Sequence, residues 1–247
     1  MMRGWLTAAV LCLAAPQAPA QDFEREARWR AEAVPNLVVG EAVDLRTVDG
    51  RAFLGLYTVS PGARTALVIV HGIGVHPDHG VIGTLRMALA DKGFTTLSIQ
   101  MPVQAADAPA EAYAKLMPLA AERIAAAAAW LAERSYGDLV LVSHSMGGRM
   151  ANAYFDGAAR PAFRGWAALG LGQDYSARFA RAKPVPVLDV QGEADLPAVL
   201  KTAAARRRVA ESTAGGRQFT VAGADHFYAG RHAELIAAIA AFAASPM

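Results

Sequence analysis

The sequence predicts an α/β fold, with a mostly parallel twisted sheet, helices on both faces, an antiparallel hairpin at its start and no large cap domain. From Thr65 onward, short apolar runs alternate several times with helix-compatible segments, which is typical of a parallel sheet covered by helices. Before that point, two alternating runs flank Asp49-Gly50, a strong hairpin turn signal. No insertion between these segments is long enough to form a separate cap.

The elements follow one another in a regular order. The hairpin strands are expected over residues 42–48 and 52–59. Six further strands are expected over residues 66–70, 95–99, 139–142, 165–169, 185–190 and 218–221. Helices are expected between them, over residues 81–92, 110–134, 146–158, 197–210 and 231–243. Pro118 lies inside the second helix and is expected to break or kink it, because proline removes a helical hydrogen bond.

Residues 1–20 have the pattern of a secretory signal peptide. Arg3 supplies a positive start, residues 5–15 are apolar, and Ala18-Pro19-Ala20 matches the small-residue cleavage pattern. The apolar stretch is shorter than the roughly 20 residues needed to span a bilayer. We therefore expect cleavage, a periplasmic or secreted protein, and no stable membrane insertion. Residues 21–40 would form a surface arm without chemistry, and residues 41–247 the α/β domain.

Composition narrows the class of protein. The chain has 247 residues, 54% of them apolar, and its 24 basic and 22 acidic residues nearly balance. A chain of this length buries enough surface to need no disulfide or metal for its core, and its only cysteine, Cys12, lies in the expected signal peptide. Nucleic-acid binding normally needs a concentrated basic face. The one basic cluster, Arg206-Arg207-Arg208, is better explained as a solvated helix end, so no nucleic-acid partner is expected.

Ser145 follows an apolar strand and precedes a helix-compatible segment, in the run Ser143-His144-Ser145-Met146-Gly147. This resembles the G-x-S-x-G nucleophile elbow, in which a sharp strand-to-helix turn exposes the serine to a base and to backbone donors. Ser143 replaces the first glycine and could push the elbow off its geometry. The simpler alternative for Ser145 is an ordinary helix N-cap.

Three other strand ends carry residues that could converge on Ser145, because ligands of open α/β sheets bind at the carboxyl ends of the strands. They are the run after residue 70, Asp195 after the fifth parallel strand, and His226 after the last strand. Ser, Asp, His is the chain order of the α/β-hydrolase triad. Asp189 and Glu193 compete for the acid, but Asp195 lies at the loop tip before a helix and is preferred.

The chain resembles the α/β-hydrolase superfamily over about residues 41–244. Over residues 70–103 it resembles an uncharacterised bacterial family within it, through His71-Gly72, His76-Pro77-Asp78, Leu85-Arg86, Leu89, Gly93-Phe94 and the run from Thr96 to Val103. The resemblance implies Ser145 as nucleophile, His226 as general base and Asp195 as the residue that orients it. Physical chemistry agrees, since imidazole exchanges protons near neutrality and a buried carboxylate fixes its tautomer.

The oxyanion hole should consist of two backbone amides. Met146 follows the nucleophile at a helix N-terminus, where free amides favour an anion. The second donor should be the amide of Ile73, with Gly74 as the alternative. Pocket residues expected nearby are His71, Gly72, Gly74, His76 and His144.

A metal site at His71, His76 and His79 is a weaker alternative. Their spacing could hold zinc. A turn at Pro77-Asp78 and a structural His71 beneath the loop that carries Ile73 and Gly74, here called the oxyanion loop, explain the run more simply. We expect no metal and no cofactor.

These features predict a secreted, carboxylesterase-like serine hydrolase that acts on a small-molecule or exposed acyl substrate. Two alternatives stay open. The fold could serve a non-catalytic binding or envelope-assembly protein, as the substitution at Ser143 suggests. The same triad could also serve an acyltransferase or a cofactor-free peroxidase.

Overall fold

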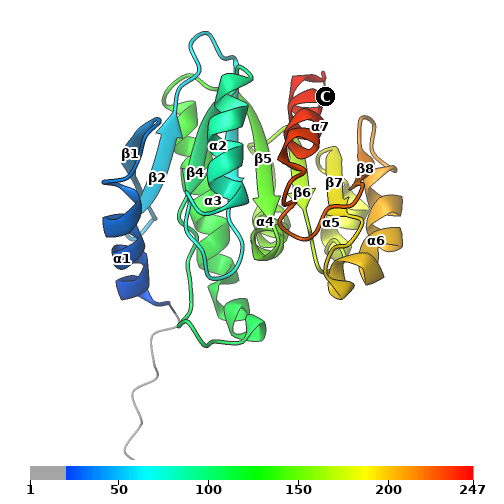
Figure 1. The fold of residues 1–247 in the computed structure, drawn as a ribbon, viewed down its shortest axis with the longest axis horizontal. Coiled ribbons are helices and arrows are strands. Elements are labelled where there is room, and N and C mark those ends of the chain that lie inside the picture. Colours follow the sequence, from blue (N-terminus) through cyan, green and yellow to red (C-terminus); the bar gives the residue numbers. More distant parts are fainter. Residues whose placement is uncertain (1–20, 247) are drawn as a thin grey trace, which may run out of the picture.

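The computed structural model describes residues 21–246, so the expected signal peptide lies outside the described residues. One eight-stranded sheet runs through the molecule in the order β1-β2-β4-β3-β5-β6-β7-β8 (Figure 1). β1 and β2 form an antiparallel hairpin, β2 pairs antiparallel with β4, and the remaining neighbours are parallel. The strands are β1 (Glu41–Arg46), β2 (Ala52–Thr58), β3 (Thr65–Val70), β4 (Thr95–Ile99), β5 (Asp138–His144), β6 (Gly165–Leu169), β7 (Val187–Gly192) and β8 (Arg217–Val221).

Helices cover both faces of this sheet (Figure 1). Strand residues alternate between two cores: Val68 and Val70 face one, and Leu67 and Ile69 face the other. This alternation follows from the two-residue period of a strand. The first core is covered by α3 (Met117–Ala132), α4 (Met146–Gly157), α5 (Ala177–Ala182) and α6 (Pro197–Ala210), and the second by α2 (Val81–Asp91) and α7 (His232–Ala244). In residues 21–246 no separate cap domain is formed, as the sequence predicted.

The predicted elements are present, with three differences. The helix expected over residues 110–134 is divided into a 3-10 helix, η1 (Ala110–Leu116), and α3, with Pro118 in the first turn of α3 where its missing N–H costs nothing. The short helix α5 was not predicted, because six residues carry too little periodicity. The arm before the domain contains α1 (Phe23–Ala33), whose N-cap residue Asp22 accepts a bond from the Arg25 amide at 2.8 Å.

The prediction that Arg206 belongs to a solvated helix end is wrong. Arg207 and Arg208 are exposed, but Arg206 is fully buried beneath α6 and its Nε donates to Asp189 at 2.8 Å. A buried arginine is stable only when its charge and hydrogen bonds are matched. Sequence alone could not reveal Asp189 as that match, because the two residues come from different elements.

The helices of residues 21–246 include none with the length and apolar character needed to cross a membrane. The carboxyl ends of the parallel strands all meet at the lower edge of Figure 1. The residues singled out as chemical candidates follow those strand ends, so the fold brings them to one edge.

Candidate active site

Ser145 occupies the sharp turn between β5 and α4. Its φ of 55° and ψ of −118° lie in a strained region for a residue with a side chain. The turn is held because the Ser145 amide donates to the Leu169 carbonyl at 2.8 Å. A side chain at Gly147 would place its Cβ 2.6 Å from the His71 carbonyl oxygen, so glycine is required where α4 crosses the end of β3.

Ser143 is accommodated without displacing this turn. Its side chain is fully buried in β5, and its hydroxyl accepts a hydrogen bond of 2.8 Å from the indole Nε1 of Trp166. The hydroxyl is therefore satisfied within the core. The position that departs from the elbow pattern has a structural partner of its own.

Ser145, His226 and Asp195 form a continuous hydrogen-bonded chain. The His226 Nε2 lies 2.9 Å from the Ser145 Oγ, and its Nδ1 lies 2.6 Å from the Asp195 Oδ1. The ring is buried against Gly170, where an added Cβ would lie 2.9 Å from the His226 Cε1. With Nδ1–H donating to Asp195, the Nε2 lone pair faces the serine hydroxyl, which is the tautomer that a general base needs.

Asp195 is held as a carboxylate by three hydrogen-bond donors. Besides His226, the amides of Gly192 and Leu196 donate to it at 3.0 and 2.8 Å. Burial alone would raise the pKa of this carboxyl, but these hydrogen bonds and the charge of His226 outweigh burial and lower its pKa below the ordinary 3.8. Asp195 therefore stays ionised and can stabilise an imidazolium.

The competing acids are committed elsewhere. Asp189 is fully buried within β7 and bonds Tyr175 and Arg206 at 2.6 and 2.8 Å. Glu193 accepts from the Gly223 amide at 2.8 Å. The structure thus brings only Asp195, of the three candidate acids, to His226.

The two expected oxyanion donors are free. Within residues 21–246, neither the Ile73 amide nor the Met146 amide donates a hydrogen bond to another protein group. Met146 is the first residue of α4, where the helix dipole adds to the attraction for an anion.

His71 orients the peptide that carries the Ile73 amide. Its Nε2 accepts from the Met101 amide at 2.9 Å, which leaves the proton on Nδ1, and Nδ1 lies 2.8 Å from the Gly72 carbonyl. Because Gly72 C=O and Ile73 N–H belong to one peptide, holding the carbonyl inward aims the amide the opposite way. Complete burial lowers the pKa of His71 to about 3, so the ring stays neutral.

His144 supports the loop that carries His226. Its Nε2 donates to the His226 carbonyl at 2.9 Å, and the two rings lie 4.8 Å apart. Burial, with a smaller contribution from the neighbouring His226, lowers the pKa of His144 to about 4. A mostly apolar cavity of about 440 Å³ begins beside this ring and is lined by residues that include Val75, Ile82 and Phe227.

The other expected pocket residues do not line that cavity. Gly72 packs between His144 and Ser145, while His71 is fully enclosed. His76 is half-buried, with its ring 5.5 Å from that of His79. His71 has both ring nitrogens engaged and does not join them, and the described residues contain no group of three or more His, Cys, Asp and Glu arranged to hold a metal ion.

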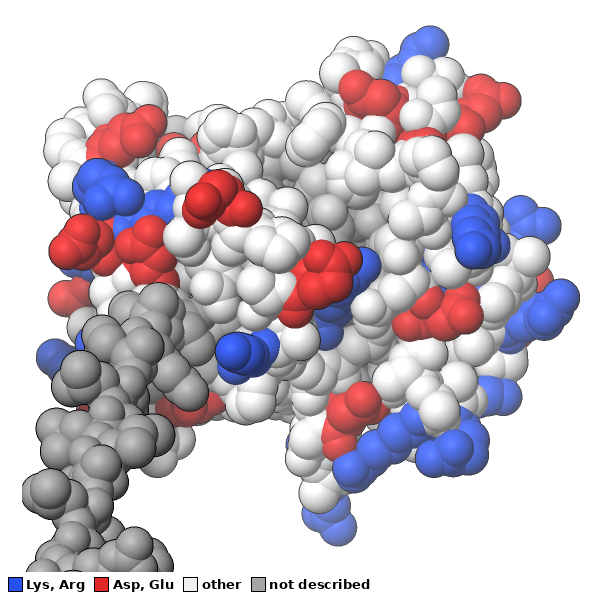
Figure 2. All heavy atoms as spheres, turned by 90° about the horizontal axis from the view of Figure 1, so that it is seen from below, with Lys and Arg blue, Asp and Glu red and all other residues white. Residues whose placement is uncertain are grey.

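Sequence reasoning missed two exposed apolar side chains beside the candidate site. Leu196 follows Asp195 and exposes 49% of its surface, and Phe227 follows His226 and exposes 59%. Ile73, expected for its amide, exposes a further 38%. Apolar residues inside otherwise polar loops were the available signal. Figure 2, which views the edge where the strands end, shows charges of both signs scattered around uncharged surface.

Residues 6–120 match the model of a family described as a protein of unknown function (DUF3530). No curated protein matches the chain.

Solved structures match most of the chain at low identity. A serine hydrolase without a lid from Xanthomonas campestris is 16% identical, with a TM-score of 0.62 over 85% of this chain and 98% of its own. Dienelactone hydrolase from Anabaena variabilis is 19% identical, with a TM-score of 0.64 over 81% and 94%. An esterase from Rhodococcus sp. is 14% identical, with a TM-score of 0.62 over 83% and 98%. These findings confirm the α/β-hydrolase fold and the resemblance to an uncharacterised family.

Proposed function

We propose that this protein is a secreted serine hydrolase that cleaves an ester or related acyl bond through an acyl-enzyme intermediate. One observation carries the proposal: the Ser145 hydroxyl lies 2.9 Å from the His226 Nε2, and the opposite nitrogen of that ring lies 2.6 Å from Asp195. A serine hydroxyl is a weak nucleophile unless a base removes its proton. The strained turn at Ser145 exposes the hydroxyl to that base.

Acylation begins when the Ser145 Oγ attacks the acyl carbon and passes its proton to His226. The carbonyl oxygen becomes an oxyanion and is stabilised by the amides of Ile73 and Met146. The imidazolium then gives its proton to the leaving oxygen as the carbon–oxygen bond breaks, which releases an alcohol. Asp195 stabilises the imidazolium throughout this step.

Deacylation repeats the same steps with water. His226 takes a proton from the water as its oxygen attacks the acyl-enzyme, and the same two amides hold the second oxyanion. Collapse returns the proton to Ser145 and releases a carboxylic acid. Asp195, His226 and the amides are regenerated, and the cycle uses no group beyond this chain and water.

The surroundings favour a substrate with an apolar acyl group. Ile73, Leu196 and Phe227 expose apolar surface beside the triad, and the cavity next to His144 is mostly apolar. Burying apolar surface stabilises a complex by about 25 cal/mol per Å². The open edge without a cap would admit small or exposed acyl groups.

Two alternatives are less well supported. A non-catalytic role was suggested by Ser143, but the Trp166 indole accommodates that hydroxyl and the Ser145–His226–Asp195 chain is complete. Acyl transfer and peroxidase chemistry use the same residues. The fold shared with proteins named as a serine hydrolase and an esterase supports hydrolysis. Product analysis with a competing alcohol or peroxide separates the three reactions.

Labelling with a fluorophosphonate probe tests the nucleophile. We expect the protein without residues 1–20 to be labelled. Ser145→Ala should lose all labelling, because it lacks the serine hydroxyl that attacks the phosphorus of the probe. Ser143→Ala is the matched control, since it removes a neighbouring buried hydroxyl and should still be labelled. Equal labelling of wild type and Ser145→Ala would reject the assignment.

Esters of graded acyl length test the substrate class. We expect kcat/KM to rise with chain length until the apolar cavity is filled. A constant kcat/KM across the series would remove the acyl-pocket part of the proposal. Secretion is tested separately, by N-terminal sequencing of protein recovered outside the cytoplasm, which should begin at Gln21.

A further inference from the structure

The helix α1 is fastened to loops at the active-site edge. The Asp22 amide donates to the Val103 carbonyl at 2.8 Å, and the Glu26 carboxylate accepts from the buried Arg123 at 2.9 Å. Arg123 in turn donates to the Gln100 carbonyl at 2.9 Å. Residues 100–103 directly follow β4, whose neighbour β3 leads into the oxyanion loop. α1 thus reaches the segment beside His71.

Arg25 bridges two of these loops with one guanidinium. One nitrogen donates to the Gln104 carbonyl at 2.9 Å, and the other donates to the Gly74 carbonyl at 3.2 Å. The group also lies 4.5 Å from the ring of Trp29, one turn later on α1. A planar guanidinium suits this bridge because its donors point in several fixed directions. A lysine ammonium is a compact point charge without that fixed geometry.

The oxyanion loop is therefore held at two successive points. His71 fixes the Gly72 carbonyl from inside, at 2.8 Å, and Arg25 fixes the Gly74 carbonyl from outside. The Ile73 amide lies between these two carbonyls along the chain. Gly74 has a φ of 70°, a conformation that glycine adopts without resistance, so the loop needs outside contacts to keep its shape.

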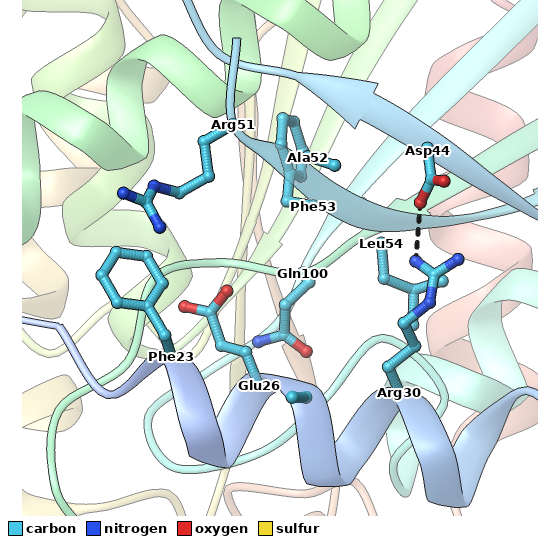
Figure 3. Close-up of a pocket in the computed structure, with 10 residues that line it drawn as sticks. Phe23, Glu26, Arg30, Asp44, Arg51, Ala52, Phe53, Leu54 and Gln100 are labelled. Atoms are coloured by element: carbon cyan, nitrogen blue, oxygen red, sulfur yellow. Dashed lines mark ion pairs between the residues drawn. The ribbon is translucent and has the colours of Figure 1, made fainter. Parts of the chain in front are cut away.

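Polar contacts, and not apolar packing, hold α1 in place. Ala33 is its only buried residue among those described. A cavity of about 360 Å³ separates α1 from the β1–β2 hairpin, and in Figure 3 Glu26 points into it while Arg30 reaches across to Asp44. The Arg30–Asp44 pair, at 2.8 Å, is half exposed, and such pairs contribute little. The orientation of α1 therefore depends on contacts such as those of Arg25.

We propose that Arg25 is a positioning residue for the oxyanion hole and that α1 acts as a clamp on the active-site loops. This inference rests on the proposed function, because it assigns Arg25 a role in aiming the Ile73 amide. Arg25 does not touch the triad. Its effect passes through the Gly74 peptide to a donor that acts only on the transition state.

Steady-state hydrolysis of a short-chain p-nitrophenyl ester by Arg25→Met tests the clamp, with active sites counted by fluorophosphonate titration. We expect kcat per titrated site to fall by about 10- to 100-fold, because small displacements of an oxyanion donor have effects of this size. KM should change by less than about threefold, since the donor acts mainly in the transition state. Arg25→Lys should recover only part of the rate.

Arg28→Met is the matched control. Arg28 lies on the same helix and exposes 66% of its side chain, and its ion pair within residues 21–246 is with Glu24, at 3.9 Å. We expect its kcat and thermal unfolding to match wild type. A kcat for Arg25→Met within about twofold of Arg28→Met, or a loss explained entirely by fewer titrated sites, would overturn the inference while leaving the proposed function intact.

Amide hydrogen exchange tests the clamp even if the ester assay fails. Arg25→Met should speed exchange in residues 72–76 and 101–105 and leave β5 and α4 unchanged, because only the bridged loops are released. Unchanged exchange in both loops would reject the clamp. If wild type binds no probe and hydrolyses no ester, the proposed function fails and the exchange result alone decides whether α1 holds the loops.

Discussion

Asp189 and Asp195 lie on the same segment, yet they form two different kinds of buried site. Asp189 is enclosed within β7 and is held by Arg206, Tyr175 and Gln218 at 2.8, 2.6 and 3.0 Å. Asp195 lies in the following loop and bonds His226 at 2.6 Å. Asp189 and Arg206 form a buried ion pair within the core, which makes the first site structural. The second site reaches a serine hydroxyl through the far nitrogen of His226, which is the arrangement that the proposed chemistry uses.

Burial and a short hydrogen bond are therefore not enough to identify a candidate catalytic carboxylate, because both aspartates have them. Both carboxylates are fully enclosed, and Asp189 has more side-chain partners. What distinguishes Asp195 is the residue beyond its partner, because the far nitrogen of His226 reaches Ser145. Substitutions at one aspartate at a time should separate the structural role of Asp189 from the role proposed for Asp195.

Neutralising Asp195 should have the largest effect, and on activity. Asp195→Asn would present an amide to His226, favour the wrong tautomer and lower kcat by about 10⁴-fold. The free energy of unfolding should change less than in Asp189→Asn, because the remaining oxygen still accepts from the Gly192 amide and no buried arginine loses its charged partner. Ester hydrolysis and urea unfolding of the same sample measure both quantities. A kcat within tenfold of wild type would remove Asp195 from the site.

Neutralising Asp189 should have the next largest effect, and on stability. Asp189→Asn leaves Arg206 as an uncompensated buried charge, which typically costs about 3–5 kcal/mol of unfolding free energy. Activity per folded molecule should be retained. Asp189→Asn combined with Arg206→Met should regain part of the loss, as measured by urea unfolding. A fully folded Asp189→Asn protein without activity would contradict the division between the two sites.

The pH dependence of stability tests whether the buried His144 is neutral in the folded protein. Burial lowers the pKa of His144 to about 4 from 6.5, so between these pH values the unfolded chain binds a proton that the folded protein refuses. Stability is therefore lost as pH falls, by roughly 3 kcal/mol for this one group. His144→Gln, which can still donate to the His226 carbonyl, should flatten the dependence by about 1.4 kcal/mol per pH unit. Urea unfolding between pH 7 and 4 is the measurement, and an unchanged slope would count against a neutral His144.

Restoring the elbow pattern should have the smallest effect. Ser143→Gly removes the acceptor of the buried Trp166 indole, which costs about 1–3 kcal/mol of stability. Since the elbow already forms around Ser143, kcat should stay within about twofold of wild type. Thermal unfolding and ester hydrolysis check the two parts. A large gain in kcat would show that Ser143 does disturb the nucleophile.

Local patterns determined much of this protein. The alternation of apolar runs predicted every strand, because strand periodicity depends on the sequence alone. The candidate residues Ser145, Asp195 and His226 could be named because each lies in the connection that follows a strand, and parallel strands end at one edge. The expectation of an elbow needed only Gly147 and the apolar run before it.

The partners of the buried polar residues depend on how the helices and strands pack together. The sequence pattern predicts a surface position for Arg206, whereas in the fold α6 packs this side chain against Asp189. α1 looked like a free arm until Arg25 was found between the Gly74 and Gln104 carbonyls. Side-chain periodicity records which residues face inward, but a hydrogen bond also depends on which distant segment lies opposite. That information arises only when the strands and helices are packed together.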